Sequence, residues 1–144
     1  MSAILKITQI GLSVLVIFYI SFLWAHEDKH EKKVVKTHWA APLEEGNQLN
    51  PVKDTIESVQ RGQNLYIANC AACHGPDAEG DGPDAEFLDS RPSNLRAMAG
   101  HHPDGDMAWK IRTGKDDMPP WKDVITEKQT WDLVNFIQNL KKMN

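Results

Sequence analysis

One pentapeptide, Cys70-Ala71-Ala72-Cys73-His74, constrains this chain more than any other feature. It has the C-x-x-C-H form that is typical of c-type haem attachment. Two thiols at this spacing lie on one helical turn, so each can form a thioether to one vinyl group of a porphyrin. The histidine that follows then lies under the iron, where histidine is a common axial ligand. The motif therefore predicts one covalently bound haem c, held by Cys70 and Cys73 with His74 on the iron.

Three other interpretations of the cysteine pair fit less well. A redox-active C-x-x-C disulfide is expected near a βαβ pattern, and a structural zinc site needs a second pair of ligands at finger-like spacing. The sequence contains neither context. A structural disulfide between thiols this close in sequence would close a strained ring. Both cysteines of the chain lie in the motif, which indicates that they serve a cofactor and not disulfide staples.

Length and charge limit the remaining choices. The chain has 144 residues and a formal net charge of −4, which leaves room for one domain and an anchor. There is no basic surplus of the kind that nucleic-acid binding requires. No nucleophile, phosphate loop or pair of carboxylates suggests catalysis. We therefore expect no nucleic-acid partner, no small-molecule substrate and no enzymatic activity of the chain itself.

A long apolar stretch lies near the N-terminus. Residues 7–25 contain no charged side chain, and this length is close to the ~20 residues that cross ~30 Å of hydrocarbon. Tyr19 and Trp24 lie near its outer end, where aromatic rings favour the membrane interface. A cleaved signal peptide is the alternative, but Leu23 is a poor match to the small residue expected before a cut after Ala25. Residues 1–25 are thus expected to be a retained transmembrane anchor or a signal segment.

Both interpretations of residues 1–25 export the domain that follows. The distribution of lysines points the other way, because Lys6 alone precedes the span and several lysines follow it, which on their own would keep the domain inside. These are Lys29, Lys32, Lys33 and Lys36. We give more weight to the haem motif, which is expected in an exported domain. The expected location is the cytoplasmic membrane, with the haem domain on the periplasmic side.

Residues 26–53 are predicted to be a charged linker, and residues 54–144 a helical domain. The linker has no helical or strand periodicity, although Trp39 and residues 50–52 are expected to dock on the domain edge. Asp54 is a candidate cap of the first helix, on which Gly62 suggests close approach by another helix. An apolar stripe from Trp131 to Leu140 predicts the last helix, beginning after Thr126 or Thr130. We expect these two helices to cross at Gly62 and Tyr66.

Together these features resemble a class I cytochrome c of the membrane-anchored bacterial type. The resemblance covers residues 54–144 and implies an all-α cytochrome c fold, with the haem in a loop-rich pocket. It is carried by the following segments: Gly62 and Tyr66, Cys70 to Gly75, Met118-Pro119-Pro120-Trp121, and Leu133 with Phe136. In that family the methionine of a Met-Pro segment is the distal iron ligand, and Met118 matches that position. The resemblance offers Arg91, Trp109 or Trp121 as candidates for bonds with the haem propionates, and the sequence does not choose among them.

The residues around Met118 support the same assignment independently. Two consecutive prolines after Met118 fix φ and reduce the freedom of the unfolded chain, so the thioether is held in position. Met98 and Met107 are competing candidates, although methionine is also a common filler of apolar cores. His101 and His102 lie in a stretch that is typical of a solvated turn, and residues 75–100 should form turns with short helical pieces.

An iron bound by protein on both faces has no position for a substrate and is expected to transfer single electrons. The sequence therefore predicts a membrane-tethered monohaem cytochrome that passes electrons between respiratory donor and acceptor proteins. One alternative is a cytochrome c subunit of a larger membrane oxidoreductase complex. Another is a ligand-binding or peroxidatic haem protein, in which Met118 would leave the iron open.

Overall fold

The computed structural model describes residues 38–142, which form one compact unit. The expected anchor at residues 7–25 lies outside the described residues. Within residues 38–142, no helix is long and apolar enough to cross a membrane. The described part is helical and contains no named strand, in agreement with the expected cytochrome c fold. Its elements are α2 Leu43–Gly46, α3 Ile56–Asn69, α4 Ala71–His74, η1 Ala85–Phe87, α5 Leu95–Met98, α6 Asp104–Thr113, α7 Glu127–Asn139 and η2 Leu140–Lys142.

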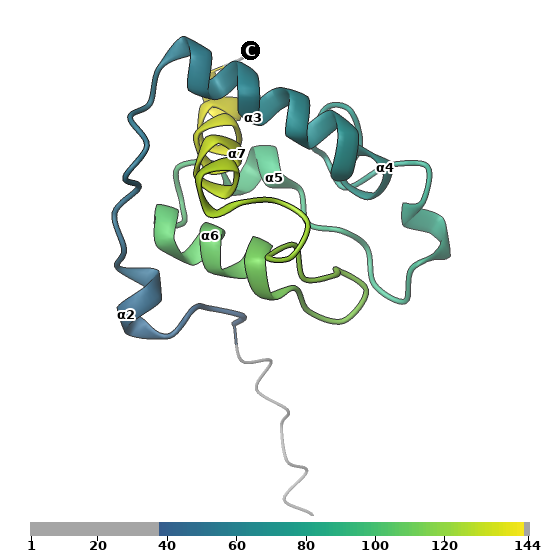
Figure 1. Cartoon of the computed structure of the whole chain (residues 1–144). Helices are drawn as coiled ribbons and strands as arrows, with labels where there is room; N and C mark the ends of the chain where they lie inside the picture. Colours follow the sequence, from purple (N-terminus) through teal and green to yellow (C-terminus); the bar gives the residue numbers. More distant parts are fainter. Residues whose placement is uncertain (1–37, 143–144) are drawn as a thin grey trace, which may run out of the picture. The chain divides into compact units, whose positions relative to one another are not determined.

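Helices α3 and α7 form the centre of the domain, and Figure 1 shows α3 running across α7. They cross at Gly62, where an added Cβ would overlap the carbonyl oxygen of Asp132. Next to this point the rings of Tyr66 and Phe136 lie 5.2 Å apart. The predicted crossing of the first and last helices is therefore confirmed. It places Tyr66, fully buried, between α7 and the turn that carries Cys70.

The ends of these two helices follow simple capping rules, with one correction to the sequence-based expectation. Thr126 caps α7, and its hydroxyl accepts from the N–H of Gln129 in a capping box. Helix α3 is capped by Thr55, whose hydroxyl accepts from Ser58 N–H at 3.2 Å, so the prediction that Asp54 is the cap was wrong. Asp54 instead accepts from the side-chain amide of Asn139. The side-chain amide of Asn139 in α7 binds the Asp54 carboxylate, and the hydroxyl of Thr55 caps α3 instead.

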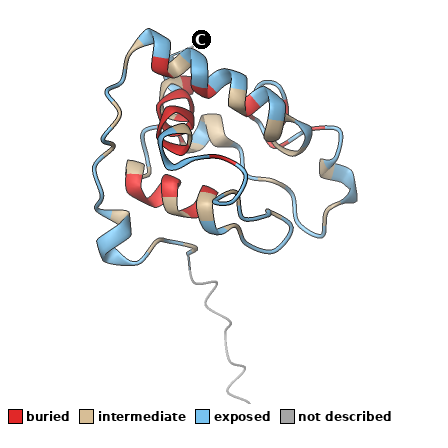
Figure 2. Cartoon of the chain, in the orientation of Figure 1, coloured by how far each residue is buried: buried red, intermediate tan, exposed pale blue. Residues whose placement is uncertain are grey.

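The core lies between α3, α6 and α7, and the buried residues in Figure 2 are concentrated on α6 and α7. Met107, Ile111, Leu133 and Val134 are among them. Residues 75–100 form turns with only η1 and α5, as predicted from their glycine and proline content. Burying these side chains supplies the main favourable term for a domain of this size.

Residues 38–53, which we call the strap, pack on the domain. The strap contains α2, which lies against α6. The N–H of Ala41 donates to the buried Asp106 at 2.7 Å, and the Asn50 amide donates to Asn135 of α7 at 2.8 Å. The strap therefore joins both helices by hydrogen bonds from its two ends. The boundary between linker and domain at residue 54 stays a prediction, but the contacts of residues 38–53 are those of the folded domain.

Candidate haem site

The C-x-x-C-H motif forms the junction between α3 and α4. Cys70 follows the last residue of α3, and the next turn closes through hydrogen bonds from the N–H groups of Cys73 and His74 to the Cys70 carbonyl, at 3.1 and 2.9 Å. The two thiols are free, and both are partly buried. The Tyr66 hydroxyl donates to the carbonyl of Gly75, just after the motif, at 2.5 Å. This bond ties the motif to the helix crossing.

The imidazole of His74 is held in one tautomer by the loop that faces it. Its Nδ1 lies 3.0 Å from the carbonyl oxygen of Ser93, and because a carbonyl can only accept, Nδ1 carries the proton. Burial lowers the pKa of His74, and the Ser93 contact offsets this only in part. The ring is therefore neutral with an unprotonated Nε2, which is the form of histidine that binds metals, oriented by a partner at its other nitrogen.

The two thiols have raised pKa values. Burial and then the charge of Cys73 raise the pKa of Cys70 to about 12, and burial followed by the charges of Asp84 and Asp117 raises that of Cys73. A reactive redox thiol is stabilised as the thiolate, with a lowered pKa. The environment of Cys70 and Cys73 instead stabilises the protonated thiols, which disfavours a redox disulfide.

Met118 lies at the end of a tight turn. Lys115 and Met118 exchange both of their backbone hydrogen bonds, at 2.9 Å each. Past the two prolines, Trp121 N–H donates to the Ile111 carbonyl at 3.2 Å, which fastens the loop to α6. The Met118 side chain is partly buried against the core. Its position is therefore set on both sides of the chain, by the turn before it and by α6 after it.

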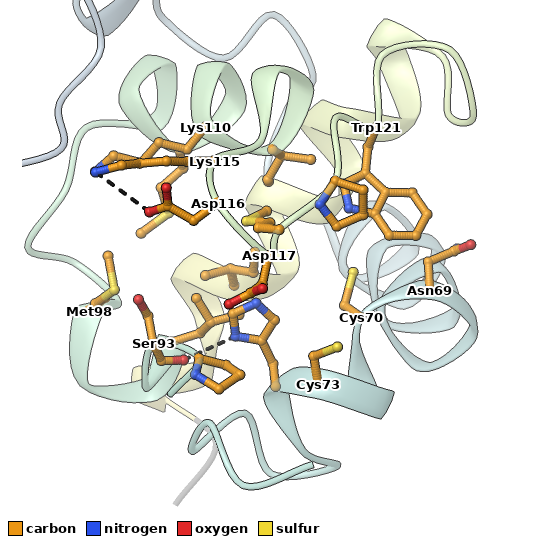
Figure 3. A pocket seen from close by; sticks show the side chains of 18 of the residues that line it. Asn69, Cys70, Cys73, Ser93, Met98, Lys110, Lys115, Asp116, Asp117 and Trp121 are labelled. Carbon is orange, nitrogen blue, oxygen red and sulfur yellow. Dashed lines mark hydrogen bonds and ion pairs between the residues drawn. The ribbon is translucent and has the colours of Figure 1, made fainter. Parts of the chain in front are cut away.

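Cys70, Cys73, His74 and Met118 all line the same cavity, which measures about 270 Å³ and is shown in Figure 3. Most of its wall is apolar, formed by side chains from α5, α6, α7 and the intervening loops. These include Leu88, Leu95, Ile111, Leu133 and Ile137. An apolar cavity that presents two thiols, a neutral imidazole and a thioether matches the needs of haem c: two attachment points, nitrogen and sulfur ligands, and a dry surrounding.

The other candidate ligands of the iron differ in whether they line this cavity. Met98 and Met107 line it together with Met118, so the structure brings three methionines to the site. Neither His101 nor His102 lines it. His102 is not solvated as expected, because its Nδ1 lies 3.0 Å from Asp106 Oδ2 and its ring stacks on His38. The fold uses this turn to bury an ion-pair network, a role that the polar local sequence did not indicate.

Of the three residues considered for the propionates, Arg91 and Trp121 line the cavity and Trp109 does not. Trp109 packs instead against Trp39, with ring centroids 6.3 Å apart. Trp39, Lys110 and Lys115 are among the polar cavity residues that the sequence did not assign to the site. No local motif marks them, because they come from the strap, from α6 and from the turn before Met118.

The chain is similar to known proteins in sequence and in fold. The family model described as cytochrome C oxidase, cbb3-type, subunit III matches residues 57–137, more than half of the chain. No curated protein matches. The fold is similar to a chain of the reducing HAO-like protein complex Kustc0457/Kustc0458 of Kuenenia stuttgartiensis, with a TM-score of 0.56 and 22% identity. That match covers 62% of this chain and 46% of the other, so this chain spans about half the length of its structural neighbour.

A second solved structure, the KustC0563 c-type cytochrome, is 27% identical with a TM-score of 0.46; the match covers 56% of this chain and 96% of that one. The strap lies entirely outside the residues that the family model matches.

Proposed function

On the premise that this chain belongs to the family described as cytochrome C oxidase, cbb3-type, subunit III, we propose that it passes single electrons between redox partner proteins. The chain is a monohaem c-type cytochrome with covalently bound haem c. Bound haem supplies a one-electron iron couple whose potential depends on its axial ligands and surroundings. The rest of the chemistry belongs to the protein, which has to hold the group, fix both ligands and exclude water.

Each of four side chains has one role in this proposal. Cys70 and Cys73 form the thioethers, while His74 and Met118 are the axial ligands of the iron. The observation that carries the proposal is that all four line one and the same apolar cavity. The proton of His74 is directed to Ser93, which leaves Nε2 for the metal. Met118 stands on a turn closed by hydrogen bonds and followed by two prolines.

Two protein ligands on the iron would leave no position for a substrate. This supports a carrier over a catalyst. Methionine on the distal face raises the potential relative to a second histidine, which suits a carrier that accepts electrons from a respiratory donor.

Membrane tethering completes the proposal. Residues 7–25 form an uncharged run of about the length that spans a bilayer, and they precede the described domain. We place the domain on the periplasmic side of the cytoplasmic membrane, where it would meet respiratory donor and acceptor proteins. Fractionation of cells that produce the full-length protein tests this. A haem protein that stays with the membrane in high salt and is released by detergent supports the tether.

A second candidate role is that of the cytochrome subunit of a larger oxidoreductase complex. The description of its family names an oxidase subunit, and its structural neighbour belongs to a complex. Purification in mild detergent separates the two roles. A carrier elutes alone, whereas a subunit elutes with stoichiometric partners.

Ligation is tested by replacing each of the three cavity methionines with leucine, which nearly conserves volume. Met118→Leu should keep the covalent haem, bind carbon monoxide when reduced, and lose the far-red band of a methionine-ligated ferric haem. Met98→Leu and Met107→Leu are matched controls and should keep the band and exclude carbon monoxide. If one of the controls loses the band and Met118→Leu keeps it, the distal ligand is that other methionine.

A further inference from the structure

The haem cavity has two chemically different ends. Cys70 and Cys73 lie on one side of it, and Figure 3 shows Lys110 and Lys115 reaching the side away from both thiols. A porphyrin attached through its vinyl groups carries its two propionates on the opposite edge. The lysines therefore lie where the carboxylates of a group fixed at the cysteines would be directed.

Lys110 is an unusual residue for such a wall. Its side chain is only 9% exposed, and its Nζ donates to Asp106 Oδ2 at 2.7 Å. A buried ammonium needs compensating acceptors, and it carries three N–H donors. Among residues 38–142, Asp106 is the one acceptor recorded for it. That same carboxylate also binds His102 and the Ala41 N–H, so Lys110 has donors to spare for another anion.

Trp39 of the strap brings the two lysines together. The Nζ of Lys110 lies 5.5 Å from the centroid of the Trp39 ring, and that of Lys115 lies 5.8 Å from it. Each distance is within the range of a cation–π contact. Two ammonium groups thus converge on one indole at the wall of an apolar cavity, with Asp106 as the buried carboxylate that pairs with one of them. Two carboxylates carried by one group would match them in charge and number.

The nearby acidic side chains do not supply these two carboxylates. Asp106 is shared among three donors. Asp116 lies 4.0 Å from Lys115, but its side chain is 72% exposed and can turn to water. Asp117 accepts from the Ser90 N–H. In the part of the chain that the structure describes, Asp106 is therefore the one buried carboxylate beside the two lysines, and it pairs with Lys110, whereas Lys115 has only the exposed Asp116. Lys110 keeps unused N–H donors and Lys115 has no close ion pair there, so both can still bind a further carboxylate.

We propose that Lys110 and Lys115, held over the indole of Trp39, bind the haem propionates, so that the strap completes the cofactor site. This inference rests on the proposed attachment of haem at Cys70 and Cys73. It assigns a binding role to a residue outside the segment that the family model matches. It also adds two residues to Arg91 and Trp121 at the polar edge of the group.

The expected consequence is electrostatic. A cation near the iron disfavours the ferric state, so removing it lowers the reduction potential. The effect of Lys110 should exceed that of Lys115, because the Lys115 side chain is 48% exposed and its charge is screened. Trp39→Leu should also lower the potential, because it releases both lysines and admits water to that edge.

The test uses full-length holoprotein and compares Lys110→Gln and Lys115→Gln with Lys142→Gln. Lys142 is a matched control, since its side chain is 70% exposed and does not line the cavity. Redox titration should give a lower potential for the first two variants and a wild-type value for the control. Resonance Raman spectra should show a shifted propionate deformation band in the first two variants alone. Lys110→Arg should restore the potential, because it keeps the charge and the donors.

Two outcomes are decisive. If Lys110→Gln and Lys115→Gln differ from wild type no more than Lys142→Gln in potential and in the propionate band, the lysines serve only to hold the strap. Should the buried Lys110 variant fail to fold, the half-exposed Lys115 decides the question. Failure of the proposed axial ligation would be a separate result. The wild-type ferric spectrum would then lack the far-red band, but the propionate band in the Raman spectrum could still be measured.

Discussion

Gly114 packs so closely against the backbone of Met118 that an added Cβ would overlap the Met118 carbonyl oxygen and the two prolines after it. Its φ of +63° is in the left-handed region that glycine adopts without strain. The residue therefore serves two purposes, since it reverses the chain after α6 and makes room for the loop that carries the proposed ligand. The geometry of Met118 depends on a residue that does not touch the cavity.

Replacing Gly114 with alanine should displace Met118 and leave haem attachment intact. Strain in the left-handed region and the overlap together cost about 1–3 kcal/mol. We expect a weaker far-red ferric band, partial binding of carbon monoxide and a lower midpoint of denaturant unfolding. Gly46→Ala is the control, because a Cβ there meets Ala41 at an ordinary 3.6 Å. An unchanged band in Gly114→Ala would mean that the loop holds Met118 without this close contact.

Gly62→Ala should destabilise the domain, because the new methyl group would push α3 away from the carbonyl of Asp132 at the helix crossing. Overpacking of this kind costs about 1–3 kcal/mol. Thermal and denaturant unfolding of the holoprotein measure the loss, again against Gly46→Ala. Equal stability of the two variants would contradict the close crossing of α3 and α7.

The buried carboxylate of Asp132 should make the stability of the fold sensitive to acid. Burial alone would raise the pKa of its carboxyl. Hydrogen bonds from Arg61, Ser58 and Lys128 outweigh this effect and lower the pKa to about 2. Because this folded-state pKa lies below the ordinary 3.8, the carboxylate stabilises the fold above about pH 4, and the contribution is lost as the pH falls toward 2.

Asp132→Asn should therefore lower stability at pH 7 by roughly 2 kcal/mol and flatten the loss of stability between about pH 5 and pH 2. Denaturant midpoints measured across this range check both effects. The exposed Asp123→Asn is the control and should run parallel to wild type. A variant curve that keeps the wild-type slope would show that other carboxyls govern acid unfolding.

Asn135 links the strap to the helix pair. Its amide donates to the Val52 carbonyl at 3.1 Å and to Ser58 Oγ at 2.8 Å, and its oxygen accepts from Asn50. Asn135→Ala removes these three hydrogen bonds at a cost of about 1–3 kcal/mol, although Ser58 keeps its bond to Asp132 and Asn50 its bond to the Trp131 carbonyl. We expect faster hydrogen exchange at the Val52 amide, with less change in α7. Asn64→Ala, on the exposed face of α3, should leave this exchange rate unaltered.

Much of the helical framework could be predicted from local patterns. The crossing at Gly62 follows from a glycine inside an apolar helical stripe. The start of the last helix was left open between Thr126 and Thr130, and the structure places the cap at Thr126. Asp54 was mistaken for the cap of α3 because the chain offers two good capping residues in succession. The choice of Thr55 depends on Asn139, which binds Asp54 from another helix. Ile56 lies at the apolar spacing of the first helix, yet the structure leaves its side chain 83% exposed.

By itself the sequence determined the chemistry of attachment. Cys70, Cys73 and His74 are neighbours in the chain, so their spacing on one helical turn is a local property that no distant contact has to supply. The same holds for Met118 between its turn and its prolines. Their roles on the iron stay predictions, but the structure places all four on one cavity.

Only the tertiary structure decided what surrounds that chemistry. Trp39 and Lys110 are far apart in sequence, yet they meet at the same wall because the strap turns back over α6. His102 and Asp106 likewise acquire their environment from the strap, through His38 and Ala41. The physical reason is that burial and charge pairing are properties of packed surfaces, and those surfaces exist only after distant segments have come together.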